Sequence, residues 1–537
     1  MYDAQYENGQ KVPIPQSTID KIITALKRFK HTTIDFGVPQ DSTHVRILAT
    51  EATRNATNSV EYIAAVEQAL GGPWKVELLR KEDEGRIGAL GVVSSVGGSE
   101  GLEGLMMDLG GGSTQITWLI ARPGEEIQTS PIGSASFPYG AAALTRTLSE
   151  LHADSNRASL RATMVEDFRV AYDRLQLSEA LQQKAKGRGL TLYLSGGGFR
   201  GWGYLLMSSH RIRPYPIPIV NGFSVHVKDF KDTVNVSNIA LQTLQDKLEG
   251  DVGVFRVSKR RAAQVPAVSF LVDALIEAIP VIAEVRFCQG GVREGWLFDS
   301  FDTPLRVTDP LVAASGRFTV HEPSAEKLAE LLAAALPQDN SALDRQIPPG
   351  VRDRHLLRGL ANLMYLQQGH SKESAAVNAL HIPITGVLAS AHGVGHCERA
   401  FLSLMLCQRW GGAGELPAPH GELRNRLELL LTHQEAWWAR YTGIIAWALG
   451  EVYPAGRIPA GRIQISTRWS EGLGKKGLLQ GVVLDLTVRK DTNGELLIDK
   501  DVITNIVDTI EAMGKKKNRV GGRDYGFGIP IRVDVHR

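Results

Sequence analysis

The stretch from Met106 to Leu119, MMDLGGGSTQITWL, limits what this chain can fold into more than any other part of the sequence. An apolar run reaches an aspartate, passes three glycines and two hydroxyl residues, and becomes apolar again, as in a strand, a turn and a second strand. Consecutive glycines let backbone N–H groups point toward one position and form a nest for an anion. A glycine-rich hairpin is the alternative, but a hairpin needs fewer glycines than this. The pattern therefore predicts a phosphate-binding turn.

The carboxylate before this turn gives the predicted site its chemistry. Asp108 cannot bind a phosphate directly, because like charges repel. It can hold a divalent cation that bridges to the phosphate, or it can orient an attacking water. We therefore expect Mg²⁺ at Asp108 and phosphate contacts from the turn residues Gly110, Gly111, Gly112, Ser113 and Thr114.

A second glycine cluster, Gly196, Gly197 and Gly198, follows a strand expected at 190–198. The sequence GGGFRG at 196–201 also fits the GxGxxG fingerprint of dinucleotide-binding proteins. That fingerprint requires an acidic residue about 20 positions later, and no Asp or Glu occurs between 202 and 228. The sequence also has no GxxxxGK[ST] motif. Nicotinamide binding and the P-loop ATPases are therefore disfavoured, and a second phosphate nest is the preferred interpretation.

The first 300 residues alternate between helical and strand-like patterns, which is the signature of an α/β sheet. Helices are expected at 17–38, 56–70, 81–96, 139–151, 157–185 and 257–279, and strands at 44–52, 74–79, 106–119, 126–137 and 190–198, with a strand and a polar turn at 281–299. The composition changes near 300–350, which indicates a boundary. Residues 351–450 have helical apolar spacing, and the tail reads as a ββαβ unit with its helix at 500–514.

Composition excludes several classes of protein. A formal net charge of +2 argues against a dedicated nucleic-acid binder, which would carry a basic face. No apolar run approaches the roughly 20 residues needed to span a bilayer. The three cysteines, Cys288, Cys397 and Cys407, form no CxxC pair, as is usual in a reducing compartment. We expect a cytoplasmic protein that binds neither membrane nor nucleic acid.

Six segments carry a resemblance to a known family. They are ATEATRNATN (49–58), KEDEGRIGALGV (81–92), DLGGGSTQI (108–116), LSGGG (194–198), SKRRAAQVP (258–266) and GGVREGWLFD (290–299). Their order and spacing resemble the Ppx/GppA exopolyphosphatase family, which belongs to the actin/sugar kinase/Hsp70 superfamily. The segment HCERAFLSLMLCQRWGG and the ββαβ tail resemble the fungal branch of that family, the retrograde regulators that carry mitochondrial status to nuclear transcription.

The resemblance implies an α/β fold with two actin-like (ribonuclease H-like) domains around a cleft, followed by a helical region and the ββαβ unit. The expected parts are 1–102 and 103–305 for the two actin-like domains, 306–455 for the helical domain and 456–537 for the C-terminal unit. The family's first strand and its DxGSNS-type turn should precede residue 1. The opening MYDAQYENGQ resembles the segment after that hairpin, so we expect the first domain to be truncated.

The resemblance also assigns roles to single residues. Glu84 matches the glutamate that activates the attacking water, and Asp108 matches the metal-associated aspartate. Arg54, Arg260 and Arg261 are expected to face an anionic substrate, because planar guanidinium groups suit phosphate. From the residues alone, Glu84 could instead be a solvated helix-start charge and Arg54 a surface arginine. The family's glutamate after GGGST is replaced by Gln115, which should weaken metal binding.

The segment SAHGVGHC offers a competing metal site. His392, His396 and Cys397 could act as ligands if 392 and 396 shared a helix face. Gly393 and Gly395 disfavour a helix there, and no HExxH glutamate or His-Asp pair is present. We therefore prefer a structural role for these histidines, and a core role for Trp437 and Trp438.

Three functions remain compatible with these features. The preferred one is a regulator of mitochondria-to-nucleus retrograde signalling that binds ATP, polyphosphate or guanosine polyphosphate and contacts a regulatory protein partner, with weak hydrolysis or none. The second is an active exopolyphosphatase, ATPase or guanosine pentaphosphate hydrolase, which would be a metal-dependent phosphoanhydride hydrolase. The third is a non-catalytic scaffold. A homodimer is an open possibility for the assembly of the chain.

Overall fold

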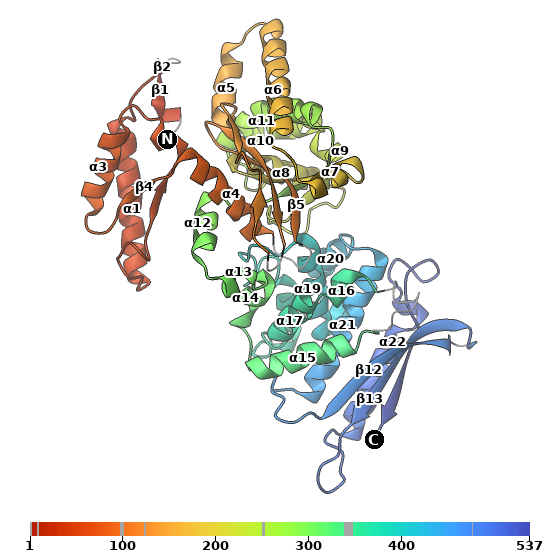
Figure 1. The fold of residues 1–537 in the computed structure, drawn as a ribbon. Helices are drawn as coiled ribbons and strands as arrows, with labels where there is room; N and C mark the ends of the chain where they lie inside the picture. The colour runs from red at the N-terminus through yellow and green to blue at the C-terminus, as the bar shows by residue number, and fades with distance from the viewer. Residues whose placement is uncertain are drawn as a thin grey trace. The chain divides into compact units, whose positions relative to one another are not determined.

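The computed structural model describes residues 3–7, 10–96, 101–122, 125–249, 253–337, 347–474 and 476–537 (Figure 1). The chain divides into two compact units. Unit 1 contains Met1–Val96, Glu100–Ser209 and Phe223–Arg306, and unit 2 contains Gly97–Ser99, His210–Gly222 and Val307–Arg537. Part of the 300–350 boundary segment, residues 338–346, lies outside the described residues. Within the described ranges, no helix is long and apolar enough to cross a membrane.

Unit 1 is built around a seven-stranded mixed sheet with the order β10-β11-β9-β5-β6-β7, in which β8 also pairs with β6. The strands are β5 Leu102–Leu109, β6 Thr114–Ala121, β7 Gln128–Thr129, β8 Ala135–Phe137, β9 Leu190–Ser195, β10 Ser224–His226 and β11 Ile282–Phe287. β5 and β6 form an antiparallel hairpin, while β9 runs parallel to β5 and β11 parallel to β9. The carboxyl ends of β5 and β9 therefore lie at one edge of the sheet.

Helices complete unit 1. They are α1 Gln16–Asp35, α2 Glu51–Arg54, α3 Ser59–Leu70, α4 Lys81–Ser95, α5 Ala141–Glu150, α6 Asp154–Arg174, α7 Glu179–Lys186, α8 Gly197–Ser209, α9 Val227–Phe230, α10 Thr233–Glu249, α11 Lys259–Ala278 and α12 Val292–Ser300. Near the N-terminus, β1 Tyr6–Glu7 pairs with β2 Gln10–Lys11, and β3 Ile47–Ala49 runs parallel to β4 Val76–Leu78. This confirms the α/β class with mixed sheets.

Glycines allow α4 and α12 to pack at very short range. A Cβ atom on Gly91 would lie 2.7 Å from the carbonyl carbon of Gly291 and 2.8 Å from its nitrogen. A Cβ atom on Gly295 would lie 2.7 Å from the nitrogen of Gly91. The motifs KEDEGRIGALGV and GGVREGWLFD therefore meet backbone to backbone. These contacts hold α4 at Ile87 and Gly91, one to two turns after Glu84.

Several sequence-based boundaries were wrong. The strand expected at 44–52 covers only Ile47–Ala49, because helix α2 begins at Glu51. The helix expected at 157–185 is interrupted between α6 and α7, and the strand expected at 190–198 ends at Ser195. The segment after β11 is a helix, α12, and not a polar turn. The Glu294 carboxylate accepts a hydrogen bond from the Gly291 N–H at 3.0 Å and starts this helix.

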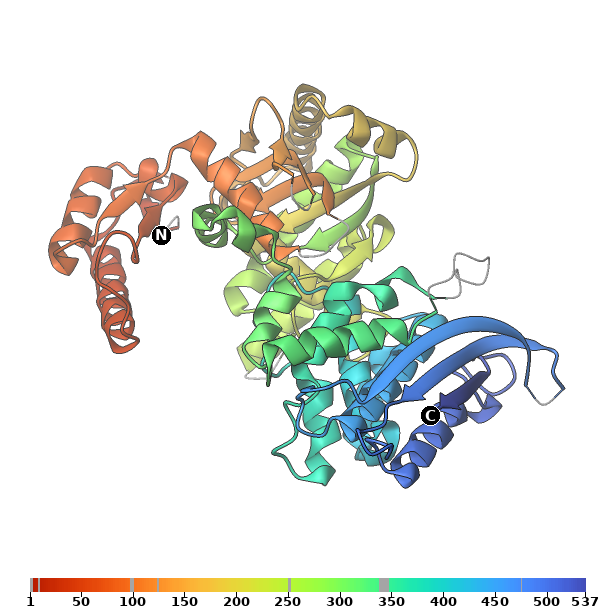
Figure 2. The same cartoon turned by 60° about the horizontal axis from the view of Figure 1, so that its bottom comes forward.

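Unit 2 combines helices with the expected ββαβ sheet. Its helices are α14 Pro310–Gly316, α15 Glu322–Ala334, α16 Pro349–Arg352, α17 Arg354–Leu363, α18 Lys372–His381, α19 His396–Arg409, α20 Ala418–Glu428, α21 His433–Val452 and α22 Lys500–Met513, and α13 Thr303–Val307 lies at the unit boundary. β12 Ile463–Leu473, β13 Leu479–Val488 and β14 Ile531–His536 form a three-stranded sheet in that order. Figure 2 shows this sheet beside the helices of the same unit.

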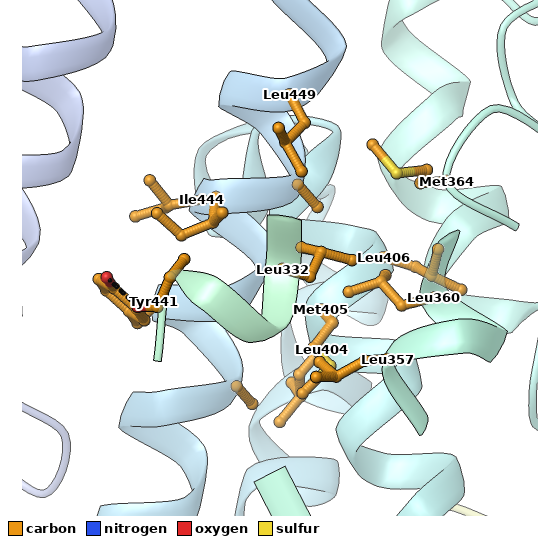
Figure 3. Close-up of a cluster of buried hydrophobic side chains, with 14 of the residues drawn as sticks. Leu332, Leu357, Leu360, Met364, Leu404, Met405, Leu406, Tyr441, Ile444 and Leu449 are labelled. Carbon is orange, nitrogen blue, oxygen red and sulfur yellow. Dashed lines mark hydrogen bonds between the residues drawn. The ribbon is translucent and has the colours of Figure 1, made fainter. Parts of the chain in front are cut away.

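The core of unit 2 is apolar and continuous. Leucines of α15, α17 and α19 interdigitate with the large side chains of α21 (Figure 3). Trp437 and Trp438 are fully buried in this core, as expected. Arg399 is also fully buried, and its guanidinium donates to the carbonyls of Val394, Leu388 and Ala391 at 3.1, 2.9 and 2.6 Å. These bonds compensate for the burial of the charge and fix the loop before α19.

Candidate phosphate and cation site

The glycine turn between β5 and β6 is anchored by the helix that follows it. The carbonyl of Gly110 accepts a hydrogen bond from the N–H of Ala141 at 2.9 Å. The carbonyl of Gly111 accepts one from Ala142 at 2.9 Å. These donors form the first turn of α5, where helix N–H groups have no partner within the helix. The N–H groups of Ala141 and Ala142, in the first turn of α5, therefore already have acceptors within the protein and are not available to a ligand.

The N–H groups of the same turn remain available. The Gly110 N–H donates to the carbonyl of Ser113 at 3.0 Å, which closes the turn. The N–H groups of Gly111, Gly112 and Ser113 have no hydrogen-bond acceptor within the ranges that the structure describes. Three successive donors without acceptors are the arrangement that binds an anion such as a phosphate group. These N–H groups are therefore open to water or to a ligand.

The second glycine cluster touches the first at the end of β5. Gly196 has φ +93°, and a Cβ atom there would lie 2.6 Å from Oδ1 of Asp108 and 2.7 Å from the carbonyl carbon of Leu109. Only glycine tolerates this conformation and this contact. Gly197 and Gly198 are the first residues of α8. The cluster therefore combines a close backbone contact at Gly196 with the start of α8 at Gly197, and its role as a second phosphate nest stays a prediction.

The surroundings of Asp108 disfavour its ionised form. Burial, together with the negative charge of Glu84, raises the pKa of Asp108 to about 6. The Ser195 hydroxyl and the positive charge of Arg200 act in the opposite direction, and to a smaller extent. The ionised carboxylate is thus less stable here than in water. A cation beside Asp108 would stabilise the ionised carboxylate and so offset the free-energy cost of burying its charge.

Glu84 lies close enough to Asp108 for their charges to interact, and its own environment is similar. Its side chain is 13% exposed, and burial raises its pKa, with a smaller opposing effect from Arg54 and a further increase from Glu51. The Arg54 guanidinium lies 3.2 Å from Oε2 of Glu84 and also donates to the carbonyl of Leu79 at 2.6 Å. Arg54 therefore positions Glu84, and its guanidinium makes two contacts with the protein.

Two residues of this site, Glu51 and Arg200, were not predicted from the sequence. The Glu51 carboxylate, on the first residue of α2, accepts a hydrogen bond from the Ser113 hydroxyl. Arg200, in the first turn of α8, influences Asp108, and its buried Nε–H has no partner in the described part of the chain. Both residues lie within recognised motifs, ATEATRNATN and GGGFRG. Their places in these motifs could have drawn attention to Glu51 and Arg200. Their contacts with Ser113 and Asp108 become visible only in the folded structure.

The two arginines expected on α11 lie near Arg200. The Arg261 side chain packs on α8, with its Cδ 3.7 Å from the position of a Cβ atom on Gly201. Burial and the charges of Arg200 and Arg260 lower the pKa of Arg261. Arg260 is exposed. This concentration of positive charge at the start of α8 and α11 favours an anion there.

The competing site in unit 2 is occupied by protein contacts. The Tyr215 hydroxyl lies 2.7 Å from Nδ1 of His396, and the carbonyl of Ile219 lies 2.9 Å from Nε2. Both ring nitrogens are therefore used to hold the segment His210–Gly222. This agrees with a structural role for His396.

The residues around Asp108 fit Mg²⁺, although they would not hold it alone. No three His, Cys, Asp or Glu side chains converge as metal ligands among the residues described. Mg²⁺ usually takes one or two carboxylates and completes its coordination with water and substrate phosphate. Asp108 and Glu84 are carboxylates of this kind, with raised pKa values that a cation would lower. When bound, Mg²⁺ would neutralise charge between these carboxylates and a phosphate in the glycine turn.

The comparisons with known proteins match both halves of the chain. The profile of the Ppx/GppA phosphatase family matches residues 3–303, and that of the RTG2 C-terminal domain matches residues 309–537. The Saccharomyces cerevisiae protein named Retrograde regulation protein 2 is 37% identical over 473 residues, covering 85% of this chain and 75% of the yeast protein.

Solved structures also match the chain. An Aquifex aeolicus Ppx/GppA family member is 22% identical, with a TM-score of 0.36, and the match covers 53% of this chain and 81% of that chain. An exopolyphosphatase from Cytophaga hutchinsonii is 19% identical, with a TM-score of 0.39, and the match covers 54% of this chain and 85% of that chain.

Proposed function

The chain belongs to the Ppx/GppA phosphatase family, and we propose that its unit 1 binds a phosphate-chain ligand together with Mg²⁺. The ligand classes are ATP, polyphosphate and guanosine polyphosphate. We propose further that the bound state controls contact with a regulatory protein partner in mitochondria-to-nucleus retrograde signalling. The yeast relative, whose name refers to retrograde regulation, supports this assignment.

One observation carries the proposal. The N–H groups of Gly111, Gly112 and Ser113 have no acceptor in the described chain, and Gly111 lies three residues after Asp108. Such a turn costs stability unless water or a ligand accepts these bonds. The adjoining pair of carboxylates with raised pKa values favours a cation next to the anion. A phosphate chain with bound Mg²⁺ would give the N–H groups their acceptors and the two carboxylates their cation.

Hydrolysis is the second candidate function, and Glu84 is the residue that favours it. A carboxylate with a raised pKa is a better proton acceptor for an attacking water near neutral pH. Arg54 partly neutralises this carboxylate at 3.2 Å, and Gln115 stands opposite Asp108 in the β5–β6 pair. We therefore propose that turnover is weak relative to binding.

The test is a thermal-shift measurement with ATP, GTP and polyphosphate, with and without Mg²⁺, while phosphate release is followed in parallel. A binding protein shows Mg²⁺-dependent stabilisation with negligible release. Release that disappears in Glu84→Gln, but persists in the neighbouring control Asp83→Asn, identifies an enzyme instead. Absence of stabilisation by every ligand would contradict both functions and leave the scaffold.

Gln115→Glu should strengthen Mg²⁺ binding by about tenfold, equivalent to about 1.4 kcal/mol. The Gln115 Oε1 atom lies 3.9 Å from the position of a Cβ atom on Gly85, the residue after Glu84. A carboxylate there adds negative charge beside Asp108 and Glu84. Isothermal titration with Mg²⁺ measures the change, and Gln115→Met is the uncharged control of similar size. Equal Mg²⁺ affinity in the two variants would show that position 115 does not contribute to the cation site.

A further inference from the structure

One buried arginine of unit 2 differs from the others. Among the described residues of this unit, Arg358, Arg399, Arg409 and Arg424 are buried, at most 9% exposed. Arg399 donates to backbone carbonyls, while Arg358 and Arg424 form ion pairs with glutamates. Arg409 is 7% exposed, yet its guanidinium has neither a hydrogen bond nor an ion pair in the described part of the chain. A buried charge normally has such a partner, because burial without one is costly.

Arg409, the last residue of α19, is enclosed by two aromatic rings and one glycine. Its Cζ atom lies 4.5 Å from the centre of the Trp410 ring and 5.8 Å from that of Tyr365. A Cβ atom on Gly450, in the last turn of α21, would lie 2.7 Å from Nε and closer still to Nη2. Glycine is unfavourable inside a helix, but at position 450 it leaves room for the guanidinium. These contacts hold the cation in one place.

The N–H donors around Arg409 lack acceptors. Nε of Arg409 and the indole Nε1 of Trp410 are both buried without a partner among the residues described. Nη1 and Nη2 of Arg409 also lack an acceptor there, but these two atoms are not buried. A group that enters from the solvent can therefore reach the Nη1 and Nη2 edge of the guanidinium.

The surroundings of Arg409 stabilise its charge only in part. Burial lowers the pKa of Arg409, and Tyr365 and Glu451 act in the opposite direction. The aromatic rings attract a cation through their faces, and the carboxyl end of α21 attracts it through the helix dipole. Neither interaction supplies a hydrogen-bond acceptor in the plane of the guanidinium. A planar oxyanion would supply one.

We propose that Arg409 is the centre of a carboxylate-binding site in unit 2, in which Nη1 and Nη2 donate to the two oxygens of a carboxylate. The planar carboxylate matches the fork of guanidinium donors. Because Glu451 and the negative end of α21 lie nearby, a single negative charge is favoured over a doubly charged phosphate. The carboxylate belongs to a small organic acid or to an acidic side chain of a protein partner. This site goes beyond the phosphate binding proposed for unit 1.

Thermal-shift titration of the full chain with succinate tests the site, without Mg²⁺ or phosphate and with the ionic strength held constant by chloride. The melting temperature of the wild type should rise and then level off as the site fills. Arg409→Met should weaken succinate binding about tenfold or more. Arg409→Lys, which keeps the charge but loses the planar fork, should also weaken it.

Arg462→Met is the matched control. Arg462 also lies near an aromatic ring, 5.7 Å from the centre of Tyr453, but its Nη1 donates to the carbonyl of Val452 at 2.7 Å. Its removal should leave the shift caused by succinate unchanged.

Two peptides distinguish the sources of the carboxylate. Acetyl-Ala-Glu-Ala-amide has only a side-chain carboxylate, and acetyl-Ala-Gln-Ala-amide is its uncharged counterpart. Stabilisation by the glutamate peptide, and not by the glutamine peptide, identifies an acidic segment of a partner as a ligand. Stabilisation by succinate alone identifies a small acid. Absence of stabilisation by both succinate and the glutamate peptide, or an equal shift in Arg409→Met, would overturn the proposal.

The stability of the free protein separates a ligand site from a structural role. Arg409 makes no hydrogen bond that holds the core, so Arg409→Met should melt at or above the temperature of the wild type when no carboxylate is present. Arg424→Met, which removes an ion pair with the buried side chain of Glu428, should melt at a lower temperature. A large fall in the melting temperature of Arg409→Met, similar to that of Arg424→Met, would show that Arg409 is structural and would overturn the proposal.

Discussion

Replacing Gly196 by alanine should lower the free energy of unfolding by about 3 kcal/mol and abolish ligand binding by unit 1. Gly196 has φ +93°, a conformation that costs an L-residue about 1–2 kcal/mol. The added methyl group would lie 2.7 Å from the carbonyl carbon of Leu109, and moving that backbone costs about 1–3 kcal/mol more. The same methyl would lie 2.6 Å from Oδ1 of Asp108 and displace the carboxylate.

Urea unfolding followed by circular dichroism measures this loss, and Gly197→Ala is the matched control. A Cβ atom on Gly197 meets nothing within 4 Å, and the residue lies in the first turn of α8. Alanine should therefore be neutral or stabilising at 197. If the two variants unfold at the same urea concentration, the close contact between the glycine cluster and β5 is not important for stability.

Asp108→Asn should make the protein more stable at pH 7 by up to about 3 kcal/mol in the absence of Mg²⁺. The pKa of Asp108 rises from 3.8 to about 6 on folding. The wild type therefore has its full stability below pH 3.8, loses it as the pH rises to about 6, and then stays at the lower value. Asparagine has no proton to lose, so the variant lacks this decline.

Chemical denaturation at a series of pH values from below 4 to 7 measures the difference between the two proteins. The gap should open between pH 4 and 6 and close when Mg²⁺ and a phosphate ligand are added, because they stabilise only the carboxylate form. A gap that is constant over this pH range, or a wild type that is the more stable protein at pH 7, would contradict the electrostatic account of Asp108.

The sequence was sufficient for the parts of the site that are local in the chain. The two apolar runs and the glycines between them predicted the β5–β6 turn and placed Asp108 just before it. The contact between Ser113 and Glu51 joins residues 62 positions apart, and no periodicity reveals it. Arg200 likewise gained its role from the packing of α8 beside β5, which follows from the parallel pairing of β5 and β9.

Two errors in the secondary structure predicted from the sequence also have physical causes. The strand expected at 190–198 included Gly197 and Gly198, but these residues begin α8, where the absence of a side chain on Gly198 avoids Leu109. Helix α10 was not predicted at all. Its apolar residues lie on two sides, one buried and one exposed with Val234, Leu241 and Leu248, so the pattern has no single amphipathic face.

Isothermal titration calorimetry with tripolyphosphate tests the central claim most directly, because this ligand has a phosphate chain but neither base nor sugar. The claim is that the N–H groups of residues 111–113 hold a phosphate while Asp108 holds the cation that neutralises it. The wild type should bind much more tightly with Mg²⁺ than without it, and Asp108→Asn should bind equally in both conditions. Absence of binding by the wild type in both conditions, or an equal gain from Mg²⁺ in Asp108→Asn, would contradict the account.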